Sequence, residues 1–305
     1  MPRAIVVGGS GTFGGIVARA IAARGLAVTL AARRRARAER LAAELAGGRA
    51  VSLDAADRLA CAAALRGHDV AVLAAGPFSR LGLAFHEAAL ESACHAVDIA
   101  EDRAFVAAVR AMGPRFASKG LAAVTGASAL PGVSLALALA ARERHGPLRS
   151  ARVALFVGND NEKGRASVET IVAQAGRRFA APGGPRVALR SGFTAPFPPP
   201  VGTRTARFIE SPELDLFPAL LGASGVVEVG VAFERDAIGR ALAFLARTWA
   251  RGPVAAAALA ERSAGLSVGA LTAPELLGWK ALLSELEKDG ITVVRGEATS
   301  PPRTE

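Results

Sequence analysis

The sequence contains no tyrosine and only two cysteines, and each scarcity excludes a class of chemistry. Without tyrosine the chain cannot hold a Tyr-x-x-x-Lys pair, which rules out the proton-transfer mechanism of short-chain dehydrogenases. Cys61 and Cys94 lie in apolar stretches, so the sequence suggests no disulfide framework and fits a reducing cytoplasm. Histidines, cysteines and carboxylates with metal-ligand spacing are also missing, and we expect no metal site.

Long apolar runs and an excess of acidic residues are absent too. The longest run, residues 130–141, is too short to span a bilayer and contains Pro131 and Gly132. No signal peptide precedes the first predicted strand, so we expect a soluble, cytoplasmic protein with no membrane partner. The net charge of +10 comes from basic residues spread along the chain without interleaved aromatics. This distribution favours a polyanionic cofactor over nucleic acid as a partner.

What the sequence does contain is an alternation of strands and helices typical of an α/β protein. The 305 residues are enough for two domains. Residues 1–132 predict a doubly wound parallel sheet of the Rossmann type. Its predicted strands are 5–7, 26–32, 50–53, 69–74, 95–99 and 121–125, and its predicted helices are 14–23, 37–45, 55–65, 83–92 and 103–112.

After residue 132 the pattern changes to that of a second, smaller α+β domain, predicted over residues 133–296. Residues 181–202 are rich in proline and glycine and predict a loop or a cover. Ser211 is expected to cap a helix that begins at Pro212. A C-terminal helix is expected to return to the first domain, and residues 297–305 are expected to form a flexible tail. The predicted strands are 152–157, 203–209, 225–233 and 291–294, and the other helices are 133–144, 167–175, 238–250 and 274–287.

A glycine turn follows the first predicted strand directly and precedes the first helix. It satisfies the G-x-G-x-x-G pattern, in which small residues let the backbone approach a pyrophosphate at the amino end of a helix. The alternative, that the glycines only build a tight turn, stays open. The predicted cofactor-binding residues here are Gly8, Gly9, Ser10, Gly11, Thr12, Phe13 and Gly14.

The end of the second strand favours NADP over NAD. An NAD site needs an acid about 20 residues past the glycines, whereas this chain has Arg33 and Arg34 there and no carboxylate before Glu39. Guanidinium groups bind a 2′-phosphate with paired, charge-assisted hydrogen bonds. The alternative is that the arginines form the solvated face of the next helix. Asp54, which ends the third strand, is expected either beside the adenine or as a helix cap.

Ligands of open α/β sheets bind at the carboxyl edge of the strands, and the remaining candidates are expected there. Asp98 lies at the end of the fifth strand and Glu101 follows it, while Asp160 lies in a polar loop of the second domain whose alternative role is ordinary turn chemistry. These three carboxylates are the candidates for proton transfer, while none of the four histidines has a convincing position. The expected nicotinamide-side residues, after the fourth strand, are Ala75, Gly76, Pro77 and Phe78.

Together these motifs resemble one known family. The runs VVGGSGTFGG, TLAARR, VAVLAAGPFSRLG, HAVDIAED and GASALPGVS are similar to the NADP-binding domain of the saccharopine dehydrogenase-like oxidoreductases, and SPELDLFPALLGASGVVEVGVAF continues the resemblance more weakly. The resemblance implies NADP as cofactor, and a second domain whose mixed sheet often carries the contact of a homodimer. Related proteins often have an acid in the loop at residues 126–131, and this chain has none.

Two functions follow from this pattern. The first is an NADP-dependent oxidoreductase that transfers hydride between the nicotinamide and a small carbonyl, imine or enoyl substrate. The second is a non-catalytic NADP-binding sensor or scaffold protein, which the lack of a clear acid or base residue favours. Turnover with a panel of substrates separates the two.

Overall fold

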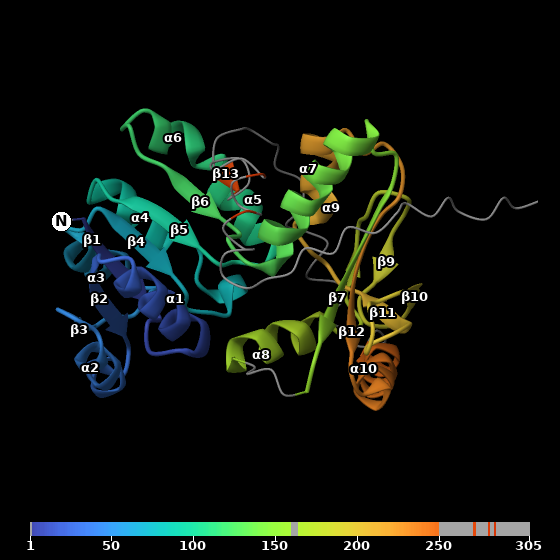
Figure 1. The fold of residues 1–305 in the computed structure, drawn as a ribbon, viewed down its shortest axis with the longest axis horizontal. Helices are drawn as coiled ribbons and strands as arrows, with labels where there is room; N and C mark the ends of the chain where they lie inside the picture. The colour runs from blue at the N-terminus through green and yellow to red at the C-terminus, as the bar shows by residue number, and fades with distance from the viewer. Residues whose placement is uncertain (1, 160–163, 250–270, 273–279, 281–283, 285–305) are drawn as a thin grey trace, which may run out of the picture.

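The computed structural model describes residues 2–159, 164–249 and 271–272, together with Lys280 and Ser284. Within these residues the chain forms a seven-stranded sheet, a four-stranded sheet and a two-stranded pair. The larger sheet with its helices forms one lobe, and the four-stranded sheet forms the core of the other (Figure 1). This arrangement confirms the predicted α/β class, with a Rossmann-type sheet and a second, smaller α+β region.

The seven-stranded sheet is parallel throughout, in the order β13-β6-β5-β4-β1-β2-β3. Its strands are β1 (Arg3–Val7), β2 (Ala27–Ala32), β3 (Arg49–Ser52), β4 (Val70–Leu73), β5 (His95–Asp98), β6 (Ala123–Thr125) and β13 (Leu271–Thr272). The helices between them are α1 (Thr12–Ala23), α2 (Arg35–Glu44), α3 (Arg58–Leu65), α4 (Ala84–Glu91), α5 (Arg103–Ala111) and α6 (Gly113–Ala117), with a 3₁₀ turn, η1 (Phe78–Arg80).

Side chains alternate across the central strand β1, and both faces are buried. Ile5 and Val7 pack into the core formed with α3, α4 and α5, whereas Val6 packs on the other face against α1 and α2. All three side chains are at most 1% exposed. A strand covered on both faces needs a continuous apolar sequence, which explains why this run was readable as a buried parallel strand.

The second sheet is mixed, because β12 pairs in parallel with β7 and antiparallel with β11. One core packs this sheet against α7, α8, α9 and η3. Its strands, in spatial order, are β10 (Gly192–Ala195), β11 (Arg204–Phe208), β12 (Val227–Phe233) and β7 (Ala151–Val157), and β8 (Arg178–Phe179) pairs with β9 (Arg186–Val187). The helical segments are α7 (Ser134–His145), α8 (Arg165–Gln174), α9 (Glu213–Leu216) and α10 (Asp236–Trp249), with π-helical turns η2 (Ala129–Val133) and η3 (Phe217–Leu221).

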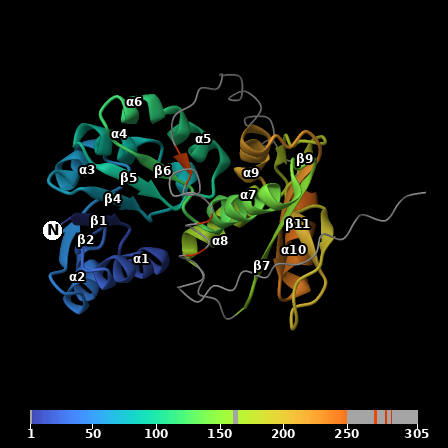
Figure 2. The same cartoon turned by 45° about the horizontal axis from the view of Figure 1, so that its top comes forward.

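Helices α7 and α8 lie between the two sheets in both views of the molecule (Figures 1 and 2). Figure 2 also shows α8 beside the end of α1. A Cβ atom built on Gly164, which precedes α8, would lie 3.4 Å from the ring of Phe13. The second lobe therefore reaches the glycine turn of the first.

Three local predictions were wrong. The helix expected from residue 55 begins at Arg58, because Asp57 and not Asp54 accepts the hydrogen bond from a first-turn amide, that of Ala60. Ser211 does not cap the following helix, since its hydroxyl donates to the carboxylate of Glu213 instead. The stretch 181–202 is more than a loop, because it contains β9 and β10, and the latter pairs with β11.

The C-terminal predictions lie mostly outside the described residues. Lys280 and Ser284 are helical, while the predicted strand 291–294 and the tail are not described. Leu271 and Thr272 form β13 beside β6, so a strand from this part of the chain joins the first sheet. Among the described helices, none has the length and apolar character needed to cross a membrane.

Candidate functional site

The glycine turn brings three segments of the first sheet into close contact. Gly8 has a φ of +84° and hydrogen-bonds through its amide to the carbonyl of Ala31 at 2.8 Å. A Cβ on Gly8 would lie 2.6 Å from the amide nitrogen of Ala75, and one on Gly14 would lie 2.1 Å from the carbonyl oxygen of Gly8. Only glycine fits at these two positions, because no side chain can enter such contacts.

Helix α1 begins directly at this turn with its amide groups free of side-chain caps. Gly11 is the N-cap residue, and the first turn holds no acidic side chain. The amino end of a twelve-residue helix carries a partial positive charge and unsatisfied N–H groups, which suit a phosphate. The turn and the helix start therefore fit a pyrophosphate at the residues predicted from the sequence, which include Gly9, Ser10 and Thr12.

The two predicted 2′-phosphate ligands follow β2 and are exposed. Arg33 and Arg34 stand directly before α2, whereas the next arginine, Arg35, is paired with Glu39 at 2.8 Å. The glycine turn is hydrogen-bonded to the end of β2, so Arg33 and Arg34, which follow β2, lie in a segment next to the turn. Asp54, also exposed, follows β3 at the same edge and accepts a hydrogen bond from Ala56 at 3.0 Å.

The loop after β4 holds the predicted nicotinamide-side residues and contacts both lobes. Ala75 lies against Gly8, as described above, and a Cβ on Gly76 would lie 3.0 Å from the Cβ of Ala166 in α8. Phe78 packs on Phe105 of α5, with ring centroids 5.1 Å apart. The loop is thus fixed between the glycine turn, α5 and α8.

Asp98 and Glu101, which the sequence placed together as candidates, have different surroundings. Asp98 ends β5 and is fully buried, and its Oδ1 accepts hydrogen bonds from Ala100, Thr125 and Gly126. Glu101 is exposed and its Oε1 lies 3.4 Å from the hydroxyl of Ser128. The loop at residues 126–131 has no acid of its own, but Glu101 from the loop after β5 places its carboxylate beside it.

The proton affinity of Glu101 is strongly perturbed. Although the residue is exposed, protein atoms crowd its carboxyl group, and this desolvation raises its pKa to about 7. The negative charge of Glu213 acts in the same direction, while the hydroxyl of Ser128 opposes it. A carboxyl group with a pKa near neutrality can both donate and accept a proton at cellular pH.

Glu213 was not among the residues predicted from the sequence. It begins α9, is completely buried, and accepts hydrogen bonds from Ser134, at 2.6 Å, and from Ser211. Burial raises the pKa of Glu213, and the two serine hydroxyls partly offset the effect. The available signal was an acid next to Ser-Pro in an otherwise apolar run, which we interpreted as helix capping.

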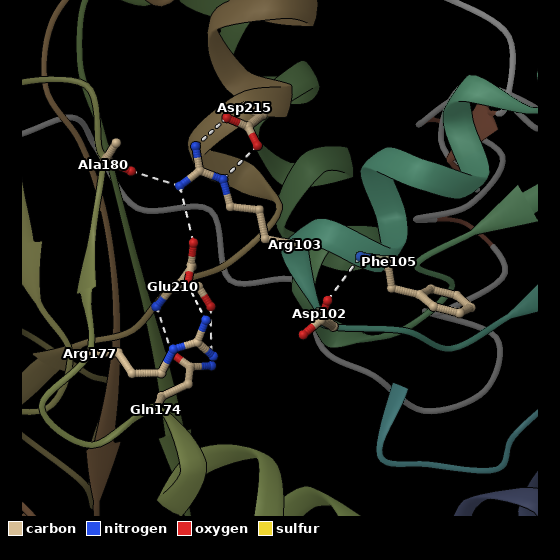
Figure 3. Close-up of polar contacts among 8 residues, drawn as sticks. All are labelled: Asp102, Arg103, Phe105, Gln174, Arg177, Ala180, Glu210 and Asp215. Atoms are coloured by element: carbon tan, nitrogen blue, oxygen red, sulfur yellow. Dashed lines mark hydrogen bonds and ion pairs between the residues drawn. The ribbon is translucent and has the colours of Figure 1, made fainter. Parts of the chain in front are cut away.

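A cluster around Arg103 joins the two lobes two residues beyond Glu101 (Figure 3). Arg103, at the start of α5, binds both carboxylate oxygens of Asp215 and donates to the carbonyl oxygen of Ala180 at 2.7 Å. Its guanidinium group also lies 3.7 Å from Glu210. The Arg103 and Glu210 side chains are 12% and 13% exposed, whereas that of Asp215 is 50% exposed, so this ionic contact between the lobes is buried at Arg103 and Glu210 and open to solvent at Asp215.

Comparison with known proteins identifies the first lobe. Residues 4–124 match the family model described as the saccharopine dehydrogenase NADP binding domain. Over these residues the chain is similar to that domain. The match confirms the resemblance seen in the sequence and ends within β6.

One solved structure shares the fold at low identity. The apo saccharopine dehydrogenase (L-Glu forming) from Saccharomyces cerevisiae is 17% identical, with a TM-score of 0.55 over 76% of this chain and 55% of that chain. This chain thus spans about half the length of the yeast enzyme. A short-chain dehydrogenase from Sphingobium yanoikuyae in complex with NADPH is 19% identical, with a TM-score of 0.35 over 41% of this chain and 69% of that chain. No curated protein matches the chain.

Other titratable groups have local structural partners or are buried. His68 is half-buried and not fully solvated as expected, with Nε2 3.0 Å from the Thr29 hydroxyl, and His95 accepts a hydrogen bond at the amino end of β5. Burial raises the pKa of each cysteine thiol to about 11. Asp160 lies outside the described residues. Among those described, no group of three or more potential ligands could hold a metal ion.

Proposed function

We propose that this protein is an NADP-dependent oxidoreductase that transfers hydride between the nicotinamide and a small carbonyl, imine or enoyl substrate. The observation that carries the proposal is Glu101, a carboxyl group with a pKa of about 7 at the carboxyl edge of the sheet. A hydride-transfer site needs a bound cofactor and a group that exchanges a proton with the substrate. The domain family supports the first requirement, and Glu101 meets the second.

In this proposal, residues of the first lobe bind NADP along the carboxyl edge of the sheet. Gly8 and Gly14 let the turn pack closely against its own backbone, which supports a tight approach of the turn to the pyrophosphate, and the amino end of α1 has amides without side-chain caps. Arg33 and Arg34 supply positive charge for the 2′-phosphate, which supports a preference for NADP over NAD. The loop from Ala75 to Phe78 continues this line toward the second lobe.

In this proposal the bound cofactor supplies the hydride, and Glu101 exchanges the proton. When a carbonyl or imine is reduced, protonated Glu101 donates to the heteroatom, and in the reverse direction its carboxylate accepts. Asp98 cannot take this part, because it has no exposed surface. Ser128 hydrogen-bonds to the Glu101 carboxyl group and holds it at the edge of the sheet.

Thermal unfolding with NADPH, NADP⁺, NADH and NAD⁺ added separately tests the cofactor part. A ligand at a hundred times its dissociation constant stabilises the folded state by about 2.7 kcal/mol. We expect a clear shift with the phosphorylated pair, which the double variant R33A/R34A loses and the matched control R37A/R40A on the exposed face of α2 keeps. No shift with any of the four nucleotides would contradict the proposal.

Turnover separates the enzyme from a sensor or scaffold. A panel of aldehydes, ketones, imines and conjugated enoyl compounds is incubated with the protein and NADPH, and NADPH oxidation is followed by absorbance. Substrate-dependent oxidation that E101Q lowers supports the proposal. Tight NADPH binding without oxidation by any member of the panel would favour the non-catalytic alternative.

A further inference from the structure

Two buried titratable groups, Asp98 and His86, lie next to the loop that carries Glu101. Asp98 and His86 are both 0% exposed, so neither can exchange a proton with a substrate directly. Three donors converge on Oδ1 of Asp98: the amides of Ala100, at 2.9 Å, and Gly126, at 3.0 Å, and the hydroxyl of Thr125, at 3.0 Å. One oxygen of this carboxylate therefore ties the loop after β5 to the loop after β6.

The other oxygen faces the imidazole of His86. Oδ2 of Asp98 lies 3.1 Å from Nε2 of His86, yet the two atoms do not meet the geometry of a hydrogen bond, and within the described part of the chain neither has another partner. A buried polar atom without a partner costs about 1–3 kcal/mol, and more when it is charged. Such a pair in a native protein calls for an explanation, and a functional role is one of the few available.

Aromatic contacts extend from His86 toward the cofactor side. The imidazole is edge-on to the ring of Phe105, with centroids 5.6 Å apart, and Phe105 packs in turn on Phe78 of the nicotinamide-side loop. Phe105 belongs to α5, which Asp102 caps through the Phe105 amide at 2.9 Å. His86 thus contacts the elements on either side of Glu101.

We propose that Asp98 and His86 form a buried pair that positions Glu101 for proton transfer. This inference rests on the proposed function, since it assigns the pair a role only through Glu101. Ala100 immediately precedes Glu101, and Gly126 lies two residues before Ser128, the hydrogen-bond partner of Glu101. Asp98 fixes both loops through Oδ1, and the imidazole of His86, whose Nε2 lies 3.1 Å from Oδ2, limits the rotation of the Asp98 carboxylate.

The test measures the titration of Glu101 itself, in the full-length protein and without a substrate. Protein labelled with ¹³C at the glutamate carboxyl carbons is titrated by NMR, and the Glu101 signal is assigned by its loss in E101Q. In the wild-type protein we expect a midpoint of about 7. In H86Q and D98N we expect it to fall by about one pH unit, because a released Glu101 becomes hydrated.

Matched variants separate positioning from general loss of stability. H68Q removes another histidine of the same domain, at the amino edge of the sheet, and should leave the Glu101 midpoint unchanged. If H86Q and D98N do not fold, variants of Thr125 provide the test. T125V keeps the shape of the side chain and removes one hydrogen-bond donor to Asp98, whereas T125S keeps the donor. We expect T125V to lower the midpoint and T125S to restore it.

The outcomes keep this inference apart from the proposed function. An unchanged Glu101 midpoint in H86Q, D98N and T125V would overturn the positioning role, whatever the effect of E101Q on turnover. Normal turnover by E101Q would overturn the proposed function. With an active substrate from the panel, we further expect H86Q to lower kcat about tenfold with little change in KM for NADPH, because the glycine turn lies on other strands.

Discussion

Glu101 joins two properties that are rarely found together, an exposed surface and a pKa raised to about 7. We predict that E101Q lowers kcat about 100-fold or more, the usual contribution of a general acid or base. Reduction needs the protonated form, so its rate in the wild-type protein should fall as pH rises above about 7, and oxidation should fall below this pH. Stopped-flow measurement of hydride transfer from pH 5 to 9 checks both limbs. Identical pH profiles for the wild-type protein and E101Q would exclude Glu101.

The same carboxyl group links folding stability to pH. Its folded-state pKa of about 7 lies above the ordinary value of 4.5, so the native state binds more protons than the unfolded state between these values. The contribution of Glu101 to stability is therefore present at low pH and is lost as pH rises through 7. We predict that E101Q is more stable than the wild-type protein at pH 8 and that the difference disappears toward pH 4.5, measured by urea unfolding. E39Q, which removes an exposed carboxylate on α2, should change stability by less than about 0.5 kcal/mol at either pH.

At the scale of elements, the contact between the glycine turn and α1 allows a sharp comparison of two adjacent glycines. A Cβ on Gly14 would lie 2.1 Å from the carbonyl oxygen of Gly8, whereas one on Gly15 would meet nothing closer than 3.5 Å. We predict that G14A destabilises the protein by about 3 kcal/mol and abolishes NADPH binding, because the turn must open. G15A should retain binding and be equal to or more stable than the wild-type protein by about 0.5 kcal/mol. Chemical denaturation and NADPH fluorescence measure the two effects, and equal behaviour of the two variants would contradict the assignment.

Elements that depend on neighbouring residues were predictable from the sequence, whereas those that depend on distant partners were not. The order of β1, glycine turn, α1 and β2 follows from apolar runs and glycine spacing within about thirty residues. By contrast, β13 exists through its pairing with β6, and β10 through its pairing with β11, in segments without a clear strand pattern. Glu213 escaped detection for a related reason, since its partner Ser134 is 79 residues away. Ser211 was misread because its hydroxyl binds a side chain and not the helix backbone.

At the scale of the whole molecule, the groups around Glu101 come from both lobes. Ser128 belongs to the first sheet's loops, whereas Glu213 begins α9 of the second lobe. The charge of Glu213 contributes to the raised pKa of Glu101, so the proton affinity of the proposed acid depends on how the lobes are held together. Arg103, two residues along the chain, is the described side chain that binds both carboxylate oxygens of Asp215 across this boundary (Figure 3).

We therefore predict that R103A weakens the contact between the two lobes and, as a result, lowers the pKa of Glu101. Removing Arg103 takes away the cation that lies between Asp215 and Glu210, and because Asp215 is 50% exposed we expect a loss of about 1–3 kcal/mol. Compared with the wild-type protein, calorimetry should show a broader unfolding transition or one that is split in two. The ¹³C titration midpoint of Glu101 should move below 7, because separation from Glu213 and hydration both favour the carboxylate. The matched control R35A breaks an exposed pair with Glu39 on the first lobe alone and should change neither measurement, apart from a loss of about 0.5 kcal/mol. A normal Glu101 midpoint in a destabilised R103A protein would show that the arginine joins the lobes without tuning the acid.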